Sequence, residues 1–282
     1  MVRISSGRLD YLVTEDLPYV DLTTEVLGIG QKPGRMTYFT REAGVLCGTE
    51  EAVRICQELG NTVVSQKPSG TRLQPGEDFL TVEGPAEALH AAWKVCLNLF
   101  DHLSAVATKA DTFVRKVKAA GAGVEVLTTR KSMPGTKDLI TKAVMTGGAF
   151  PHRLGLSETV LVFDNHIKFM GGFEEFLKQV PELRARCIEK KLFVEVTADQ
   201  ALAAVKAGVD GVQLDKADPQ AIANLVPQLR QVNPRVAIIA AGGVNMQNCE
   251  AYAATGIDGI ATTCLFTAPP LDMSVRIEAL EG

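Results

Sequence analysis

Charged residues stand in pairs beside strand-like apolar runs in the middle of this chain. Arg130 and Lys131 follow the run GVEVLTT, and His152 and Arg153 come directly after a proline further along. A guanidinium binds a carboxylate or a phosphate through two parallel hydrogen bonds, whereas a lysine ammonium acts as a point charge. The two pairs therefore indicate a site for a small anion. The alternative is surface charge that happens to follow strands.

Two carboxylates occur in a similar setting. Glu195 lies inside the apolar run LFVEVTAD, where an unpaired carboxylate would be costly to bury, and Asp215 closes the run GVQLD. Two carboxylates directed to one place suit a divalent cation such as Mg²⁺ or the hydroxyl groups of a sugar. For Asp215 the alternative is that it caps the helix that follows.

A double glycine, Gly242 and Gly243, follows the run RVAIIAA and precedes a helical stretch. At such a junction the backbone N–H groups can approach a phosphate, and a helix N-terminus favours its negative charge. A simple turn between a strand and a helix is the alternative interpretation.

These residues need a scaffold that brings them together, and the chain after Gly121 has the pattern of one. Apolar runs alternate there with amphipathic stretches, and the runs are GVEVLTT, ETVLVFD, KLFVEV, DGVQLD, RVAIIAAGG and DGIATTC. This alternation is typical of βαβ units and a parallel sheet covered by helices. A barrel and a doubly wound sheet both fit. Polar residues at the end of nearly every run favour the barrel, in which the strand ends converge.

The chain before Gly121 has the pattern of a small sheet with helices on one side. We predict helices over 5–17 and 48–60, strands over 34–45, 61–66 and 78–84, and an exposed turn over 18–28. Residues 85–120 are helical almost throughout, and Ser104 is a candidate for a join between two helices.

Composition limits the kind of protein to which the site belongs. The chain has 282 residues, 46% of them hydrophobic and 22% charged, with a net charge of −4, so we expect a folded protein without a nucleic-acid or anionic-membrane partner. The six cysteines are scattered without a C-x-x-C pair, which predicts reduced thiols and no zinc site. Asp10, Glu15 and Asp16 interrupt any signal peptide, and no apolar run approaches the roughly 20 residues of a membrane span. We therefore expect a cytoplasmic protein.

One long stretch carries a family resemblance. The segment TTRKSMPGTKDLITKAVMTGGAFPHRLGLSETVLVFDNHI resembles the core signature of quinolinate phosphoribosyltransferase, also called carboxylating nicotinate-nucleotide pyrophosphorylase. The similarity continues in TEDLPYVDLTTE, TREAGVLCGTEEA, LNLFDHLSAVAT and AYAATGIDGI, and is greatest to the ModD branch, which is associated with molybdenum transport operons.

The resemblance implies an α/β protein with the type II phosphoribosyltransferase fold, an incomplete α/β barrel preceded by an open-faced α/β sandwich. The sandwich domain would comprise residues 1–105, joined by the C-terminal tail 268–282, and the barrel would comprise residues 106–267. It also implies a homodimer or higher homo-oligomer whose active sites are shared between subunits.

The implied chemistry joins a pyridine nitrogen to the ribose of phosphoribosyl pyrophosphate, releases pyrophosphate and then carbon dioxide, with Mg²⁺ as cofactor. By the resemblance Lys131, Glu195 and Asp215 are catalytic; Lys131 faces the donor, and the two carboxylates bind ribose hydroxyls or, indirectly, Mg²⁺. The remaining predicted substrate-binding residues are Arg130, His152 and Arg153, which would hold carboxylates of the base, with Lys94, Phe163, Gly242, Gly243 and Thr263.

The chain departs from the family pattern at several of these positions. Lys94 replaces an arginine that reaches the neighbouring subunit's site, and Phe163 replaces a lysine before Asp-Asn-His. Ala241, Thr263 and Thr267 replace a serine, a glycine and a histidine. We therefore predict a phosphoribosyltransferase with altered base specificity. The alternative is a non-catalytic binder of a phosphorylated ligand or an oxyanion in molybdenum transport.

Overall fold

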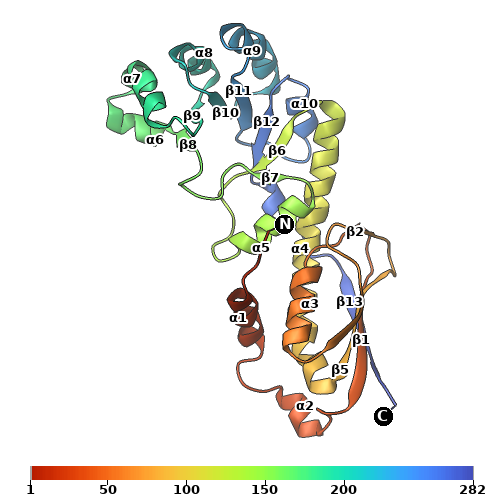
Figure 1. Cartoon of the computed structure of the whole chain (residues 1–282). Coiled ribbons are helices and arrows are strands. Elements are labelled where there is room, and N and C mark those ends of the chain that lie inside the picture. The colour runs from red at the N-terminus through yellow and green to blue at the C-terminus, as the bar shows by residue number, and fades with distance from the viewer. Residues whose placement is uncertain (1, 282) are drawn as a thin grey trace. The chain divides into compact units, whose positions relative to one another are not determined.

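The computed structural model describes residues 2–281, and the chain divides into two compact units (Figure 1). The first unit contains the chain up to Asp111, Met133–Gly148 and the chain from Phe266 onward. The second unit contains Thr112–Ser132 and Ala149–Leu265. The predicted site residues, with the exception of Lys94, belong to the second unit.

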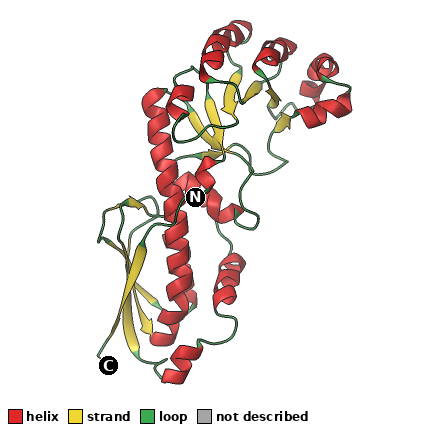
Figure 2. Cartoon of the chain, turned by 180° about the vertical axis from the view of Figure 1, so that it is seen from behind, coloured by secondary structure: helices red, strands yellow, loops and turns green. Residues whose placement is uncertain are grey.

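The first unit is built on a four-stranded antiparallel sheet. Its order is β13 (Met273–Ala279), β1 (Pro33–Thr40), β5 (Asp78–Pro85), β3 (Thr62–Gln66). Burial alternates along β1, so that Met36, Tyr38 and Thr40 face inward. Helices α3 (Thr49–Glu58) and α4 (Ala86–Ala120) cover this inner face, and no helix among residues 2–281 covers the other one (Figure 2). The predicted open-faced sandwich is confirmed.

An aromatic cluster holds α4 against the sheet. The ring of Phe100 lies edge-on to Phe79 and Tyr38, at centroid distances of 4.8 and 5.3 Å. All three side chains are buried, and edge-to-face pairs of this kind stabilise a core beyond their buried area.

The predicted join at Ser104 is wrong, because α4 is a single helix of 35 residues. Ser104 is fully buried, and its Oγ accepts a hydrogen bond from the backbone N–H of Cys47 at 3.0 Å. The hydroxyl therefore anchors the segment before α3 to the helix. A serine that is well placed for a tertiary hydrogen bond does not interrupt a helix.

The short elements of the first unit are α1 (Ser6–Asp16), α2 (Leu22–Leu27) and the two-stranded pair β2 (Gly44–Val45) and β4 (Arg72–Leu73). The turn predicted over 18–28 contains α2. The Asp21 side chain caps α2 by accepting from the N–H groups of Thr23 and Thr24 at 3.0 and 3.1 Å. Gly28, with φ of 61°, ends it.

Helix α5 (Lys137–Thr146) packs within the first unit, although the predicted sandwich domain of 1–105 and 268–282 does not include it. A buried ion cluster accounts for this position. Lys142, whose side chain is 4% exposed, pairs with Glu50 at 2.6 Å and with the equally buried Glu51. The C-terminal tail also lies in this unit, where β13 pairs with β1.

The second unit contains a seven-stranded parallel sheet. The order is β7 (Phe150–Pro151), β6 (Glu125–Thr128), β12 (Gly259–Thr262), β11 (Ala237–Ala241), β10 (Gly211–Asp215), β9 (Leu192–Val196), β8 (Val160–Val162). Strands β7 and β8 follow each other in the chain but form opposite edges of the sheet, so the sheet curls without closing. This is the predicted incomplete barrel.

Helices α7 (Phe173–Arg186), α8 (Ala198–Ala207) and α9 (Pro219–Val232) lie side by side on one face of this sheet (Figure 1). The second unit also contains the short helices α6 (Asp164–Ile167) and α10 (Cys249–Ala253) and the 3₁₀ turn η1 (Lys168–Met170). The 3₁₀ turn η2 (Cys264–Phe266) lies where the chain leaves this unit. A separate apolar cluster, of Leu161, Phe193, Ile239, Ala241 and Ala261 with Leu127, Phe163 and Ala237 packed against it, lies on the sheet. Phe193 and Glu195 share a face of β9, because side chains alternate along a strand.

All six cysteines are free, as predicted for reduced thiols. Within residues 2–281, no helix combines the length and apolarity that a membrane span would require.

Candidate active site at the carboxyl edge of the parallel sheet

The predicted site residues of the second unit gather at the carboxyl edge, which we define as the strand ends and the residues directly after them. Because all neighbouring strands are parallel, their carboxyl ends share one edge of the sheet. The edge holds Arg130 and Lys131 after β6, His152 and Arg153 after β7, Phe163 after β8, Glu195 within β9, Asp215 at the end of β10, Gly242 and Gly243 after β11, and Thr263 after β12.

Four cations at this edge have no carboxylate partner. These are Arg130, Lys131, Arg153 and Lys216, of which Lys216 directly follows β10. Within residues 2–281, no acidic oxygen lies within 4.0 Å of a side-chain nitrogen of these four residues. The charge of Arg130 adds to the burial that lowers the pKa of Arg153, so the two guanidinium groups lie close enough to repel each other. Clustered cations without counter-charges are the arrangement expected of an anion site.

His152 and Phe163 shape the part of the edge around Arg153. Burial first, and the charge of Arg153 second, lower the pKa of His152, so its neutral form is favoured at neutral pH. Its ring stands edge-on to Phe193 at 6.2 Å. The Arg153 guanidinium lies 5.6 Å from the centre of the Phe163 ring, in the range of a cation–π contact. The pair predicted as cationic, His152 and Arg153, therefore carries one charge rather than two.

The carboxylate of Glu195 is held by a neighbour that the sequence did not indicate. Gln213 lies directly opposite Glu195 in the β9–β10 register, and its Nε2 donates to Glu195 Oε2. Burial raises the pKa of Glu195; the Gln213 hydrogen bond opposes this, the Asp215 charge adds to it, and Lys131 and Lys216 oppose it. Glu195 and Asp215 thus act on each other electrostatically.

The two carboxylates fit a role as partial ligands of Mg²⁺. Carboxylate oxygens are the donors that Mg²⁺ prefers, and it usually takes only one or two from protein while phosphate and water supply the rest. No group of three or more His, Cys, Asp or Glu side chains that could hold a metal occurs within residues 2–281. The residues therefore suit a cation that arrives with a phosphorylated ligand.

The cap alternative for Asp215 is wrong, because Asp218 caps α9 by accepting from the N–H groups of Gln220 and Ala221, both at 3.0 Å. Asp215 instead borders Gly242. A Cβ atom on Gly242 would lie 2.5 Å from Asp215 Oδ1, so only glycine fits beside this carboxylate. Asp215 is consequently available to a ligand.

The double glycine does not precede a helix directly, so the predicted help from a helix N-terminus is wrong. Helix α10 begins only at Cys249 and has five residues. Gly242 and Gly243 both have φ of 81°, and neither N–H group donates a hydrogen bond to another described residue. Successive free N–H groups in such a bend can hold an anion without a helix.

Thr263 and Lys94 complete the predicted set. Thr263 Oγ1 lies 2.9 Å from Thr129 Oγ1, which joins the ends of β12 and β6. Lys94 belongs to the first unit, on α4, where its ammonium lies 4.9 Å from the centre of the Trp93 ring. The structure therefore brings the predicted residues of the second unit to one edge and leaves Lys94 on the other unit.

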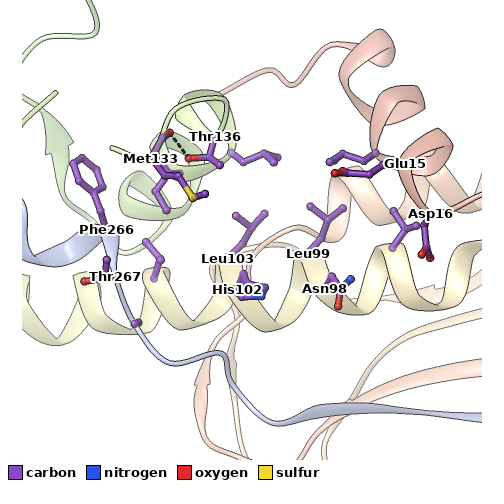
Figure 3. Close-up of a pocket in the computed structure, with 16 residues that line it drawn as sticks. Glu15, Asp16, Asn98, Leu99, His102, Leu103, Met133, Thr136, Phe266 and Thr267 are labelled. Atoms are coloured by element: carbon purple, nitrogen blue, oxygen red, sulfur yellow. Dashed lines mark hydrogen bonds between the residues drawn. The ribbon is translucent and has the colours of Figure 1, made fainter. Parts of the chain in front are cut away.

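A cavity of about 540 Å³ in the first unit is a different environment (Figure 3). Apolar side chains and His102 of α4 line it, with Glu15 and Asp16 at one end and Phe266 and Thr267 at the other. Its lining includes two carboxylates but no lysine or arginine, so it is unsuited to a phosphorylated ligand.

Two family models match the chain. The model of the quinolinate phosphoribosyl transferase N-terminal domain matches residues 21–104, and that of the C-terminal domain matches residues 106–276. The ModD protein of Rhodobacter capsulatus is 41% identical over 249 residues, which cover 88% of this chain and 95% of that protein. The carboxylating nicotinate-nucleotide pyrophosphorylase of Mycobacterium leprae is 33% identical over 257 residues, 89% of each chain. The crystal structure of NadC from Streptococcus pyogenes superposes with a TM-score of 0.90 at 26% identity and covers 100% of both chains.

Proposed function

The chain belongs to the quinolinate phosphoribosyl transferase family, a family of pentosyltransferases, and on that premise we propose that it transfers phosphoribose from phosphoribosyl pyrophosphate to a carboxylated aromatic base. The observation that carries the proposal is the carboxyl edge itself, where cations without partners stand beside two carboxylates. An acceptor with carboxylates and a donor with phosphates would neutralise the cations. The carboxylates of Glu195 and Asp215 would lie beside the ribose of the donor.

The reaction breaks the bond between ribose C1 and the pyrophosphate oxygen and forms a bond from C1 to the ring nitrogen of the base. Positive charge develops on the ribose, and Glu195 and Asp215 stabilise it. Negative charge develops on the departing pyrophosphate, and Lys131 with the free N–H groups of Gly242 and Gly243 stabilises it. Glu195 and Asp215 would hold an Mg²⁺ ion that binds with the donor, and this ion would neutralise further phosphate charge.

The base is proposed to carry less negative charge than quinolinate, which has two carboxylates. Arg130 and Arg153 offer two guanidinium groups, but His152 favours its neutral form and Phe163 presents an aromatic face. In place of the lysine of the family pattern, Phe163 therefore presents a surface on which a flat ring can stack. A pyridine with one carboxylate, such as nicotinate, matches these groups better.

A homodimer with shared sites is also proposed. The segment around α2 leaves large apolar side chains in solvent, with Tyr19 95%, Val26 75% and Leu22 68% exposed. Neighbouring exposed apolar side chains of this size are typical of a protein interface. By the family resemblance, Lys94 of each subunit in such a dimer would reach the site of the neighbouring subunit.

Pyrophosphate release tests the proposal. The protein is incubated with phosphoribosyl pyrophosphate, Mg²⁺ and single bases, including nicotinate and quinolinate, and pyrophosphate is measured. We expect release with at least one base, faster with nicotinate than with quinolinate, and none with Glu195→Ala. Absence of release with every base of the panel would overturn the catalytic proposal.

The non-catalytic alternative has one observation in its favour, the unpaired arginines, which also suit a tetrahedral oxyanion such as molybdate. Calorimetry separates the two. Micromolar binding of molybdate that is lost in Arg153→Met, together with no pyrophosphate release, would support the binder.

A further inference from the structure

Lys216 has an unusual backbone conformation at the carboxyl edge. It directly follows β10, and its φ of 53° makes it the one non-glycine residue with positive φ within residues 2–281. The other residues with positive φ in this part of the chain are all glycines. An L-residue in this region is strained relative to glycine, and such strain is concentrated at functional sites.

Neighbouring groups hold Lys216 in place. Its N–H group donates to the carbonyl oxygen of Ala241, the last residue of β11, at 2.8 Å. A Cβ atom on Gly242 would lie 2.7 Å from Lys216 Cγ and 2.9 Å from Lys216 N, so the aliphatic stem passes directly over that glycine. The Lys216 side chain therefore leaves the backbone beside the double glycine and near the Asp215 carboxylate.

Lys216 forms no ion pair within residues 2–281. No carboxylate oxygen lies within 4.0 Å of its ammonium in the described chain, and the residue is exposed. The charge is nevertheless close enough to Glu195 to lower the pKa of that carboxyl, as Lys131 also does. The ammonium, the free N–H groups of Gly242 and Gly243 and the two carboxylates thus share one region of the edge.

We propose that Lys216 binds a phosphate group of the sugar-phosphate donor, and that its left-handed backbone serves to place the ammonium beside Gly242 and Gly243. The inference rests on the proposed function, because it needs a phosphorylated donor at this edge. A turn alone does not require this residue. Glycine would adopt the same backbone conformation without strain, so the side chain is the part that a ligand would use.

The test measures binding by calorimetry with three probes: phosphoribosyl pyrophosphate, inorganic pyrophosphate and ribose 5-phosphate, each with Mg²⁺. Lys216→Met keeps the stem and removes the charge, whereas Lys216→Gly removes the side chain and relaxes the backbone. Lys206→Met is the matched control, since Lys206 is an exposed lysine in the last turn of α8, at the other end of that helix from the carboxyl edge.

We expect both Lys216 variants to bind phosphoribosyl pyrophosphate about tenfold or more weakly, as for a lost charge-assisted contact, and Lys206→Met to bind like the wild type. A matching loss with pyrophosphate places Lys216 on the diphosphate, and a matching loss with ribose 5-phosphate places it on the 5′-phosphate. Lys216→Arg should retain most of the affinity.

The two proposals fail in different ways. Unchanged affinity of Lys216→Met for all three probes would overturn the role of Lys216 while wild-type turnover still supports the enzyme. Donor binding that depends on Lys216, with no pyrophosphate release from any base, would retain the role of Lys216 and overturn the transferase. A loss of affinity in Lys216→Met but not in Lys216→Gly would also overturn the role of Lys216, because the charge would then be dispensable.

Discussion

Replacement of Gln213 by methionine is expected to move the acidic side of the pH–rate profile to higher pH. In the proposed reaction Glu195 must be ionised to stabilise positive charge on the ribose, so the rate rises as the pH passes its pKa. Burial already raises the pKa of Glu195, and the Gln213 hydrogen bond opposes that rise. Methionine has a similar volume but no N–H donor, so the pKa should rise further.

The structure sets the size of the effect. Gln213 is 7% exposed, so water cannot readily replace its N–H group beside Glu195. A hydrogen bond to a charged group contributes about 1.5–3 kcal/mol, and each 1.36 kcal/mol corresponds to a factor of about ten in a protonation equilibrium. At a pH on the acidic side of the profile the rate should therefore fall by roughly tenfold to a hundredfold, while the plateau at higher pH changes little.

Pyrophosphate release measured as kcat/KM across pH, for wild type and Gln213→Met side by side, tests this expectation. Gln228→Met is the matched control, because Gln228 lies on the exposed side of α9 and, within residues 2–281, its side chain bonds only to the carbonyl oxygen of Asn224. If the acidic side of the profile stays in place in Gln213→Met, Glu195 is not the group that titrates there. A uniform loss at every pH would instead indicate a disturbed fold.

Three further predictions address the base, the core and the long helix. Phe163→Lys should raise kcat/KM for quinolinate relative to nicotinate by about tenfold or more, measured as pyrophosphate release. The added ammonium can pair with a second carboxylate, and it replaces the ring beside Arg153. An unchanged ratio of the two kcat/KM values would contradict the proposed role of Phe163. Lys142→Met should cost about 3–5 kcal/mol of unfolding free energy in urea at pH 7, since it leaves the buried Glu51 carboxylate unpaired, and a cost below about 1 kcal/mol would argue against the ion cluster. Burial, with the nearby Asp272 charge, raises the pKa of Asp101 to about 6, so wild-type stability should fall as the pH rises through that value. Asp101→Asn should remove this dependence and stabilise the protein by about 1–3 kcal/mol at pH 7.5 and by less at pH 5 in urea titrations, whereas equal effects at both values would contradict the assignment.

The sequence by itself determined the class of fold and the position of the predicted site. Apolar runs that alternate with amphipathic stretches predicted the parallel sheet, and the polar residues after those runs predicted which edge would carry the chemistry. Both patterns are local, because side-chain alternation and strand termination depend on a few neighbouring residues. The position of Arg130, Glu195 and Asp215 at this edge could therefore be predicted without coordinates.

Local patterns were insufficient where the role of a residue depends on a distant partner. Serine is a weak helix former, which is why Ser104 was predicted to join two helices. In the structure its hydroxyl bonds to the backbone of Cys47, and α4 continues through it. In the sequence Lys142 is part of an ordinary amphipathic stretch. In the structure α5 places its ammonium between Glu50 and Glu51. A sequence pattern contains no information on which buried charge will meet which counter-charge.

The chemistry of the carboxyl edge was likewise decided by tertiary structure. The parallel register of β9 and β10 places Gln213 opposite Glu195, and the approach of β10 to β11 places Lys216 over Gly242. Burial, rather than residue type, favours neutral His152 and raises the pKa of Glu195. The sequence identified most of the groups at the site, whereas their charge states, their hydrogen-bond partners and the accessibility of Asp215 followed only from the packing of strands that are far apart in the chain.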